Sequence, residues 1–221
     1  GSAPSDRMGH SLIPLGNRLV VFGGLPFGPA GSHEWLGDLW RLRCDLAATG
    51  IASWELIAPT SEHTPVARMV ATLSPVSLSD SAHPVGLFLF GGGDGECLLN
   101  DVWLFDTRTA AVRTHRWTRH ECAGASPSPR YLHAACRVAE SMYIFGGSAA
   151  EVLLNDLWEY ALNARAWTQM VSTGGSAPSP RRGHSLVPLS NRLVVFGGCD
   201  NATNSNDSGL HCFDLQRRRW S

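Results

Sequence analysis

The stretch "PSDRMGHSLIPLGNRLVVFGG", residues 4–24, decides the fold because the chain carries it almost unchanged a second time, as "PSPRRGHSLVPLSNRLVVFGG" at residues 178–198. Both copies contain an arginine, a His-Ser pair, an apolar run and a Gly-Gly pair. The run Leu-Val-Val-Phe is β-branched or aromatic and is apolar on both faces, which indicates a strand buried on both sides. The stretch therefore predicts a buried β-strand that ends at glycines able to adopt positive φ.

The same pattern occurs four times along the chain. Each copy begins with an arginine and reaches a Gly-Gly pair after an apolar run, and three copies continue with Asp-Leu-Trp or Asp-Val-Trp. The opening arginines are Arg7, Arg68, Arg130 and Arg181, and the closing tryptophans are Trp54, Trp117, Trp167 and Trp220. In the fourth copy, "GLHCFD" at 209–214 places Cys212 or Phe213 where the others have their first tryptophan. Pro and Gly clusters separate the runs, and no segment shows helical periodicity.

These features predict an all-β fold, a β-propeller with four blades of four antiparallel strands. We expect the blades to span about residues 5–57, 65–120, 128–171 and 179–221. The last strand is cut short after Trp220, and a strand without its neighbour leaves an unpaired edge. We therefore expect the chain to be part of a larger propeller, with a closed ring of four blades as the alternative.

Two recurring side chains have expected structural roles. Large aromatic rings pack well between sheets, so five tryptophans are expected in the core: Trp40, Trp54, Trp103, Trp158 and Trp167. The aspartate of each Asp-Leu-Trp or Asp-Val-Trp is expected to cap backbone N–H groups where a strand begins.

The pattern resembles the kelch repeat, whose units run to about 50 residues with a Gly-Gly pair after the second strand and spaced aromatic residues behind it. All four units match, over nearly the whole chain, and the P-R-x-G-H-S opening looks most like kelch proteins that are not fused to BTB domains. The second unit departs from the pattern with "ARMVAT" in place of the His-Ser pair. The resemblance implies a propeller of five to seven blades whose loop face commonly binds a protein or peptide.

Enzymatic chemistry finds little support in the residues. No G-x-S-x-G, H-E-x-x-H or P-loop motif is present. His10, His133 and His184 share one repeat position, and equivalent positions on stacked sheets lie about 10 Å apart, too far for one zinc ion. We therefore expect structural histidines, no metal, no cofactor and no enzyme. The alternative is an enzyme with a metal or small-molecule site in the central channel.

Composition narrows the class of partner and the compartment. The net charge is −1, and the basic run "QRRRW" at 216–220 is short, so we do not expect a nucleic-acid partner. No apolar run approaches the roughly 18 residues of a membrane helix, so we do not expect a membrane partner. The six cysteines form no C-x-x-C motif, which indicates free thiols in a reducing, cytoplasmic location.

The candidate binding residues lie at the loops. The four opening arginines are expected at the mouth of the loop face, where guanidinium groups bind carboxylates in pairs of hydrogen bonds; alternatively, each arginine only ties neighbouring blades together. Phe27, Trp35 and Tyr131 are further candidates, because aromatic residues on rigid scaffolds are favoured at interfaces. The sequence thus predicts a non-enzymatic scaffold that binds a protein or peptide, with acidic or C-terminal segments favoured. A purely architectural subunit of a large assembly is the other alternative.

Overall fold

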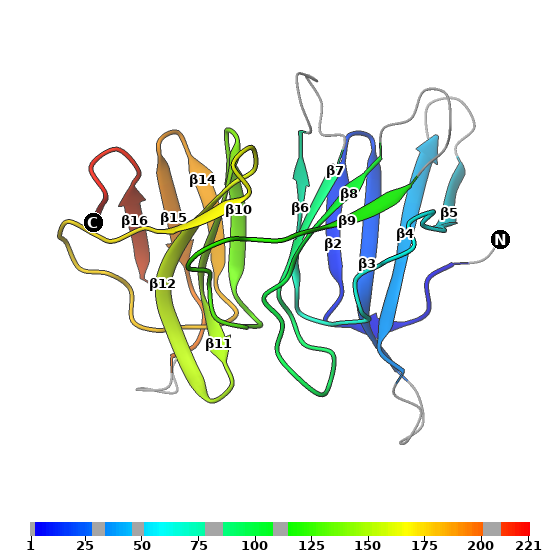
Figure 1. Cartoon of the computed structure of the whole chain (residues 1–221), viewed down its shortest axis with the longest axis horizontal. Coiled ribbons are helices and arrows are strands. Elements are labelled where there is room, and N and C mark those ends of the chain that lie inside the picture. Colours follow the sequence, from blue (N-terminus) through cyan, green and yellow to red (C-terminus); the bar gives the residue numbers. More distant parts are fainter. Residues whose placement is uncertain (1–2, 28–33, 46–50, 78–85, 108–114, 201–208) are drawn as a thin grey trace. The chain divides into compact units, whose positions relative to one another are not determined.

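The computed structural model describes residues 3–27, 34–45, 51–77, 86–107, 115–200 and 209–221, and their regular structure is β-strand. The chain divides into two compact units, Gly1–His120 and Glu121–Ser221, and each unit holds two antiparallel sheets (Figure 1). We call each sheet a blade and number the blades in chain order. Within the described residues, no helix is long and apolar enough to span a membrane.

The first unit contains blades 1 and 2. Blade 1 consists of β1 (Arg7–Met8), β2 (Ser11–Leu15), β3 (Arg18–Pro26), β4 (Leu36–Asp45) and β5 (Ile51–Ile57). Blade 2 consists of β6 (Thr72–Val76), β7 (Gly86–Phe90), β8 (Val102–Asp106) and β9 (Arg116–His120). In blade 1 the short β1 pairs with the far end of β3, and the other neighbours follow chain order, as they do throughout blade 2.

The second unit contains blades 3 and 4. Blade 3 consists of β10 (Ala134–Val138), β11 (Ser141–Ala149), β12 (Val152–Ala161) and β13 (Ala166–Gln169). Blade 4 consists of β14 (Ser185–Leu189), β15 (Arg192–Phe196), β16 (Leu210–Asp214) and β17 (Arg219–Trp220). The all-β prediction of four blades with four antiparallel strands is thus confirmed, with β1 as an additional strand in blade 1.

The core of each unit lies between its two blades. In the first unit Phe22 and Leu39 of blade 1 belong to one buried cluster with Trp103 and Phe105 of blade 2. In the second unit Phe145 of blade 3 shares a cluster with residues of blade 4 that include Phe213 and Trp220. Four of the five tryptophans expected in the core are buried, whereas Trp54 is half-buried. Trp117 and Trp220 are buried as well, although the sequence argument left them out.

The Gly-Gly pairs adopt positive φ in every blade, which is the conformation that glycine tolerates best. A Cβ on Gly92 would lie 2.7 Å from the carbonyl oxygen of Met69, so the close backbone approach also requires glycine. The strand ends before the pair in blades 2 and 4, as expected. In blades 1 and 3 the strand instead continues past the pair through a register shift, so the expectation that the pair always ends the strand was wrong.

The register of blade 4 corrects the alignment of the fourth repeat. Val21 of blade 1 pairs with Trp40, and its equivalent Val195 in blade 4 pairs with His211. His211 therefore occupies the position of the first tryptophan, rather than Cys212 or Phe213. Gly209 consequently stands where the other blades have aspartate.

Candidate functional site

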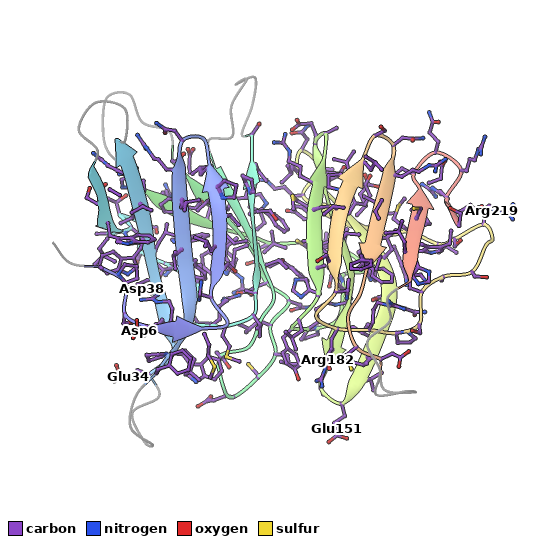
Figure 2. All side chains as sticks on the ribbon, turned by 180° about the vertical axis from the view of Figure 1, so that it is seen from behind. Asp6, Glu34, Asp38, Glu151, Arg182 and Arg219 are labelled. Atoms are coloured by element: carbon purple, nitrogen blue, oxygen red, sulfur yellow. The ribbon has the colours of Figure 1, made fainter. Side chains whose placement is uncertain are left out.

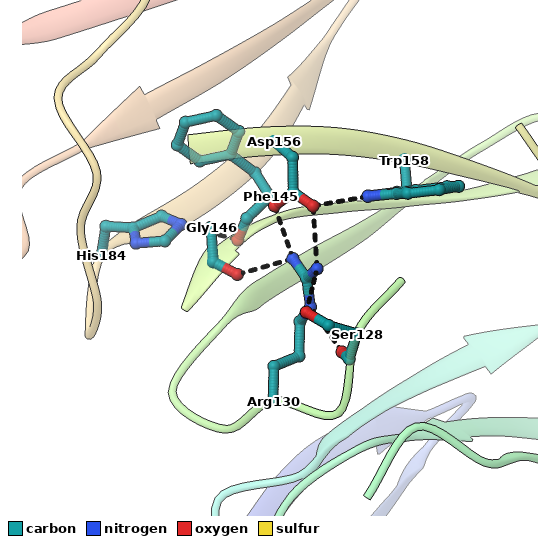
Figure 3. Close-up of polar contacts among 7 residues, drawn as sticks. All are labelled: Ser128, Arg130, Phe145, Gly146, Asp156, Trp158 and His184. Carbon is teal, nitrogen blue, oxygen red and sulfur yellow. Dashed lines mark hydrogen bonds and ion pairs between the residues drawn. The ribbon is translucent and has the colours of Figure 1, made fainter. Parts of the chain in front are cut away.

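Each opening arginine forms the centre of a polar cluster inside its own blade, shown for blade 3 in Figure 3. Arg130 donates from Nη1 and Nη2 to the two carboxylate oxygens of Asp156, at 2.7 and 2.8 Å. It also donates to the carbonyl oxygens of Gly146 and Ser128 and to the Ser128 hydroxyl. These bonds use all five N–H donors of the guanidinium group, so none is left over for an outside ligand.

The indole of Trp158 completes the cluster. Its Nε1 donates to Asp156 Oδ2 at 2.6 Å, on the same carboxylate that accepts from the arginine. We call this set of arginine, aspartate and tryptophan the clamp. The aspartate was expected to cap backbone N–H groups; its main partners are instead a guanidinium and an indole, because the strand register brings all three side chains together.

The clamp recurs in the first unit. Arg7 bonds to Asp38 at 2.6 and 3.0 Å, and Arg68 bonds to Asp101 at 2.6 and 2.9 Å. Trp40 and Trp103 donate to these carboxylates at 2.6 and 2.7 Å. In blade 4, Arg181 keeps the bonds to the Gly-Gly carbonyl (Gly197, 2.9 Å) and to Ser179, while Gly209 occupies the aspartate position.

Burial and charge make the clamp a structural element. Arg68, Arg130 and Arg181 are at most 1% exposed. Burial alone would raise the pKa of Asp101, but hydrogen bonds from Arg68 and its positive charge outweigh burial and hold this pKa below its ordinary value. We expected the guanidinium groups at an open mouth, free to bind carboxylates. Their enclosure within the blades supports the alternative that they hold the scaffold together.

The backbone of the arginine, rather than its side chain, joins neighbouring blades. Within the first unit, Arg68 accepts at its carbonyl from the N–H of Gly24 and donates from its own N–H to Leu36 O. Within the second unit, Arg181 makes the same two bonds with Gly147 and Leu154. One residue thus fixes the strands of its own blade through its side chain and the preceding blade through its main chain.

The residue after each arginine faces the other way. These residues are Met8, Met69, Tyr131 and Arg182, which we call the platform residues. Each forms an antiparallel bridge with the residue directly after the Gly-Gly pair. Since successive side chains of an extended chain point to opposite faces, burial of the arginine directs the platform residue outward. Met8 is 46% exposed, and the other three are half-buried.

Comparison with known proteins adds to this geometry. The family model described as the KLHDC2/KLHL20/DRC7 Kelch-repeats domain matches residues 87–221, more than half of the chain. The chain belongs to the kelch-repeat family. The resemblance to the kelch repeat and the all-β fold class are thereby confirmed.

Three relatives show the range of proteins that contain such a kelch domain. Human host cell factor 2 is 31% identical over 238 residues, which cover 97% of this chain and 29% of that protein. The Drosophila melanogaster leucine-zipper-like transcriptional regulator 1 homolog is 28% identical over 235 residues, covering 100% and 22%. The Arabidopsis thaliana acyl-CoA-binding domain-containing protein 5 is 31% identical over 215 residues, covering 96% and 29%. The chain thus spans less than a third of each of these relatives.

The aromatic candidates of the kelch domain differ in accessibility. Phe27 is 68% exposed and lies just beyond β3. Trp35 is half-buried, and a Cβ on Gly95 of blade 2 would lie 2.5 Å from its indole Nε1, so the ring is packed against that loop. Tyr131 is half-buried and bridges to Ser148 through its backbone. Phe27 is therefore the most accessible of the three, whereas Trp35 supports the loop of blade 2.

Met8 and Met69 were not among the residues that the sequence singled out. The signal was present, because the position after each arginine carries Met, Met, Tyr and Arg while the arginine itself does not change. Variation beside a fixed residue is typical of a scaffold that presents different side chains from the same place.

The histidines after the arginines are structural where they are buried. His184 donates from Nε2 to the carbonyl oxygen of Phe145 in the neighbouring blade at 3.1 Å, and the two rings meet edge to face (Figure 3). Burial lowers the pKa of His184 to about 4, with the hydrogen bond opposing this and the charge of Arg181 adding to it. Within the described ranges, no group of three or more His, Cys, Asp or Glu side chains is placed to hold a metal ion.

Proposed function

We propose that this kelch domain is a non-enzymatic binding module that takes a protein or peptide partner at the loop end of its blades. The observation that supports this most directly is the pair Met8 and Phe27, two large apolar side chains that are 46% and 68% exposed on a rigidly held backbone. Solvent-exposed methionine and aromatic side chains of this kind are favoured at protein interfaces.

The backbone beneath these two side chains is fixed. Met8 pairs with Leu25 in the β1–β3 ladder, and the N–H of Phe27 donates to Asp6 O at 3.2 Å. Arg7, the neighbour of Met8 in the chain, is held by its ion pair with Asp38 at 2.6 Å. A partner that binds here orders little additional main chain, so more of the contact energy appears as affinity.

The charged residues at the loop end of blade 1 indicate what kind of partner would bind there. Figure 2 shows Asp6, Glu34 and Asp38 at the loop end of blade 1, and both Asp6 and Glu34 are exposed. The sequence predicted an acidic partner because of the four opening arginines. The N–H groups of these arginines instead donate hydrogen bonds within the blades. A partner with an apolar segment and basic flanks fits blade 1 better. The cytoplasmic location stays a prediction, and a partner drawn from that compartment would agree with it.

The test is affinity purification with mass spectrometry, using the wild type and a Met8→Ser/Phe27→Ser double variant. We expect proteins captured by the wild type to be lost from the variant. Leu56→Ser is the matched control, because Leu56 is a comparably exposed apolar residue on the outer strand β5. Capture that survives the double variant and is lost with Leu56→Ser would place binding on the outer strand and overturn the proposal.

A further inference from the structure

A cavity of about 200 Å³ lies between blades 1 and 2, within the first unit. It is found at the end of the strands where β3 begins, which is the opposite end of β3 from its Gly-Gly pair. Its walls are about half polar, and five polar side chains line it: Asn17, Arg18, Arg41, Thr107 and His115. The cavity is partly open to solvent, and a cleft with a few convergent polar groups is the usual form of a ligand site.

The charges around this cavity are unbalanced. Arg18 pairs directly with Arg43 across β3 and β4, and Arg41 points to the same face two residues before Arg43. Like charges in directly opposite positions destabilise a sheet. Glu55 accepts from Arg41 at 2.7 Å and from Arg43 at 2.9 Å, so one carboxylate already serves two guanidinium groups.

Arg18 is the cation that this carboxylate does not satisfy. Arg18 is exposed to solvent, and within the part of the chain that the structure describes its guanidinium group makes no hydrogen bond and no ion pair with protein. Burial lowers the pKa of Arg18, and the positive charges of Arg41 and Arg43 lower it further, against the opposing effect of Glu55. Arg41 is itself only 8% exposed, so its charge is poorly screened by water.

The fold does not require these arginines. In blade 2 the positions equivalent to Arg18, Arg41 and Arg43 hold Gly86, Leu104 and Asp106, according to the strand registers. Blade 3 has Ser141, Glu159 and Ala161 at these positions, and blade 4 has Arg192, Cys212 and Asp214, so the cluster of three arginines belongs to blade 1.

We propose that this cavity binds a small oxyanion of the size of phosphate, held by Arg18 and Arg41 of blade 1 together with Thr107 and His115 of blade 2. Guanidinium groups match the oxygens of such anions with paired, charge-assisted hydrogen bonds. The His115 ring stacks on Phe105 with centroids 5.9 Å apart, so its orientation is fixed toward the cavity it lines. The site is separate from the loop end, and its occupation does not depend on the proposed partner.

The duplicated stretch supplies a matched control. Arg192 is the equivalent of Arg18, but it pairs across the sheet with Asp214, and its Nε lies 3.9 Å from that carboxylate. Replacing Arg192 thus removes the same side chain from a position where the charge is already balanced.

The experiment is calorimetric titration of the whole chain with inorganic phosphate at constant ionic strength, set with chloride. We expect saturable binding that Arg18→Gln weakens about tenfold or more, as loss of a charge-assisted hydrogen bond would produce, and that Arg192→Gln leaves within about twofold. Arg18→Lys keeps the positive charge but loses the planar pair of N–H donors. Its affinity for phosphate should therefore lie between those of Arg18→Gln and Arg192→Gln. A second titration with glycerol phosphate distinguishes the free ion from a phosphate group on a larger molecule. If the site takes a phosphate ester, glycerol phosphate binds more tightly than inorganic phosphate; if the site takes the free ion, it does not.

Two results would overturn the site. One is the absence of saturable phosphate binding by the wild type. The other is an equal loss of phosphate affinity in Arg18→Gln and Arg192→Gln, which would mean that phosphate is attracted to arginine side chains in general. Circular dichroism of each variant establishes that the compared proteins are folded.

Discussion

The two near-identical stretches, 4–24 and 178–198, fold into the same local structure and meet different surroundings. Both form a strand pair joined by a tight turn, and both reach glycines at positive φ. Yet Phe22 is buried while its equivalent Phe196 is 52% exposed, and His10 is exposed while His184 is buried. Local sequence thus determines the strand and its glycines, whereas the neighbouring blade determines what each side chain contributes.

The largest expected contrast is between Phe22→Ala and Phe196→Ala. Phe22 packs against Trp117 with ring centroids 5.5 Å apart, and loss of a buried phenylalanine costs about 3–5 kcal/mol. Phe196→Ala should cost less than about 1 kcal/mol, because half of the ring is already in water. Denaturant unfolding of both variants measures the two losses. Equal losses would mean that Phe196 is covered in solution and that the two stretches have similar neighbours.

The second contrast concerns pH. The unfolded chain protonates His184 near its ordinary pKa of about 6.5, whereas the folded protein does so only near the lowered pKa of about 4. The unfolded state therefore binds more protons within this window, and the free energy of unfolding falls as the pH drops through it, by roughly 2–3 kcal/mol.

Unfolding measured at pH 7 and pH 4.5 tests this effect. His184→Gln should reduce the pH dependence, and the remainder belongs to His133, whose pKa burial lowers to about 3. A pH dependence in His184→Gln as large as in the wild type would contradict this assignment.

The smallest contrast lies in the turn between the first two strands. Gly16 and Ser190 occupy equivalent positions with φ of 60° and 54°. A left-handed conformation costs a residue with a Cβ about 1 kcal/mol relative to glycine, and a Cβ on Gly16 would meet no atom within 4 Å. Ser190→Gly should therefore stabilise the protein by about 0.5–1 kcal/mol, and Gly16→Ser should destabilise it by a similar amount. Thermal unfolding of the two variants will show opposite shifts, and shifts of the same sign would contradict this interpretation.

The sequence predicted the repeating parts of the fold, because strands, glycines and tryptophans recur at regular intervals. It did not predict where the arginines would point. The partner of Arg130 is Asp156, 26 residues away, and only the register of the intervening strands shows that the two meet. The same limit applies to Arg18 and Arg43, whose opposition across the sheet creates the charge imbalance. In the fourth repeat, the segment before β16 differs from the other repeats, and the first tryptophan position could be assigned to His211 only from the pairing with Val195.

Part of the proposed binding surface was already a candidate in the sequence. Phe27 and Tyr131 emerged from composition, since aromatic residues next to glycine-rich loops are typical of interfaces. The arginines became binding candidates because they recur in every repeat, but recurrence fits a structural role equally well. A residue that every repeat needs is a poor candidate for distinguishing partners, and the variable residue beside it is a better one.

The most direct test of this division uses two adjacent residues, Arg130 and Tyr131. The measurement is the affinity of the captured partner for Arg130→Lys and Tyr131→Ala, under conditions where circular dichroism shows both variants folded. We predict that Tyr131→Ala weakens binding about tenfold or more with nearly unchanged stability. Arg130→Lys should be less stable, because it loses the paired hydrogen bonds to Asp156. Its affinity for the partner should stay within about twofold of the wild type. Folded Arg130→Lys that no longer binds, beside Tyr131→Ala that binds normally, would contradict the account and make the arginine the contact residue.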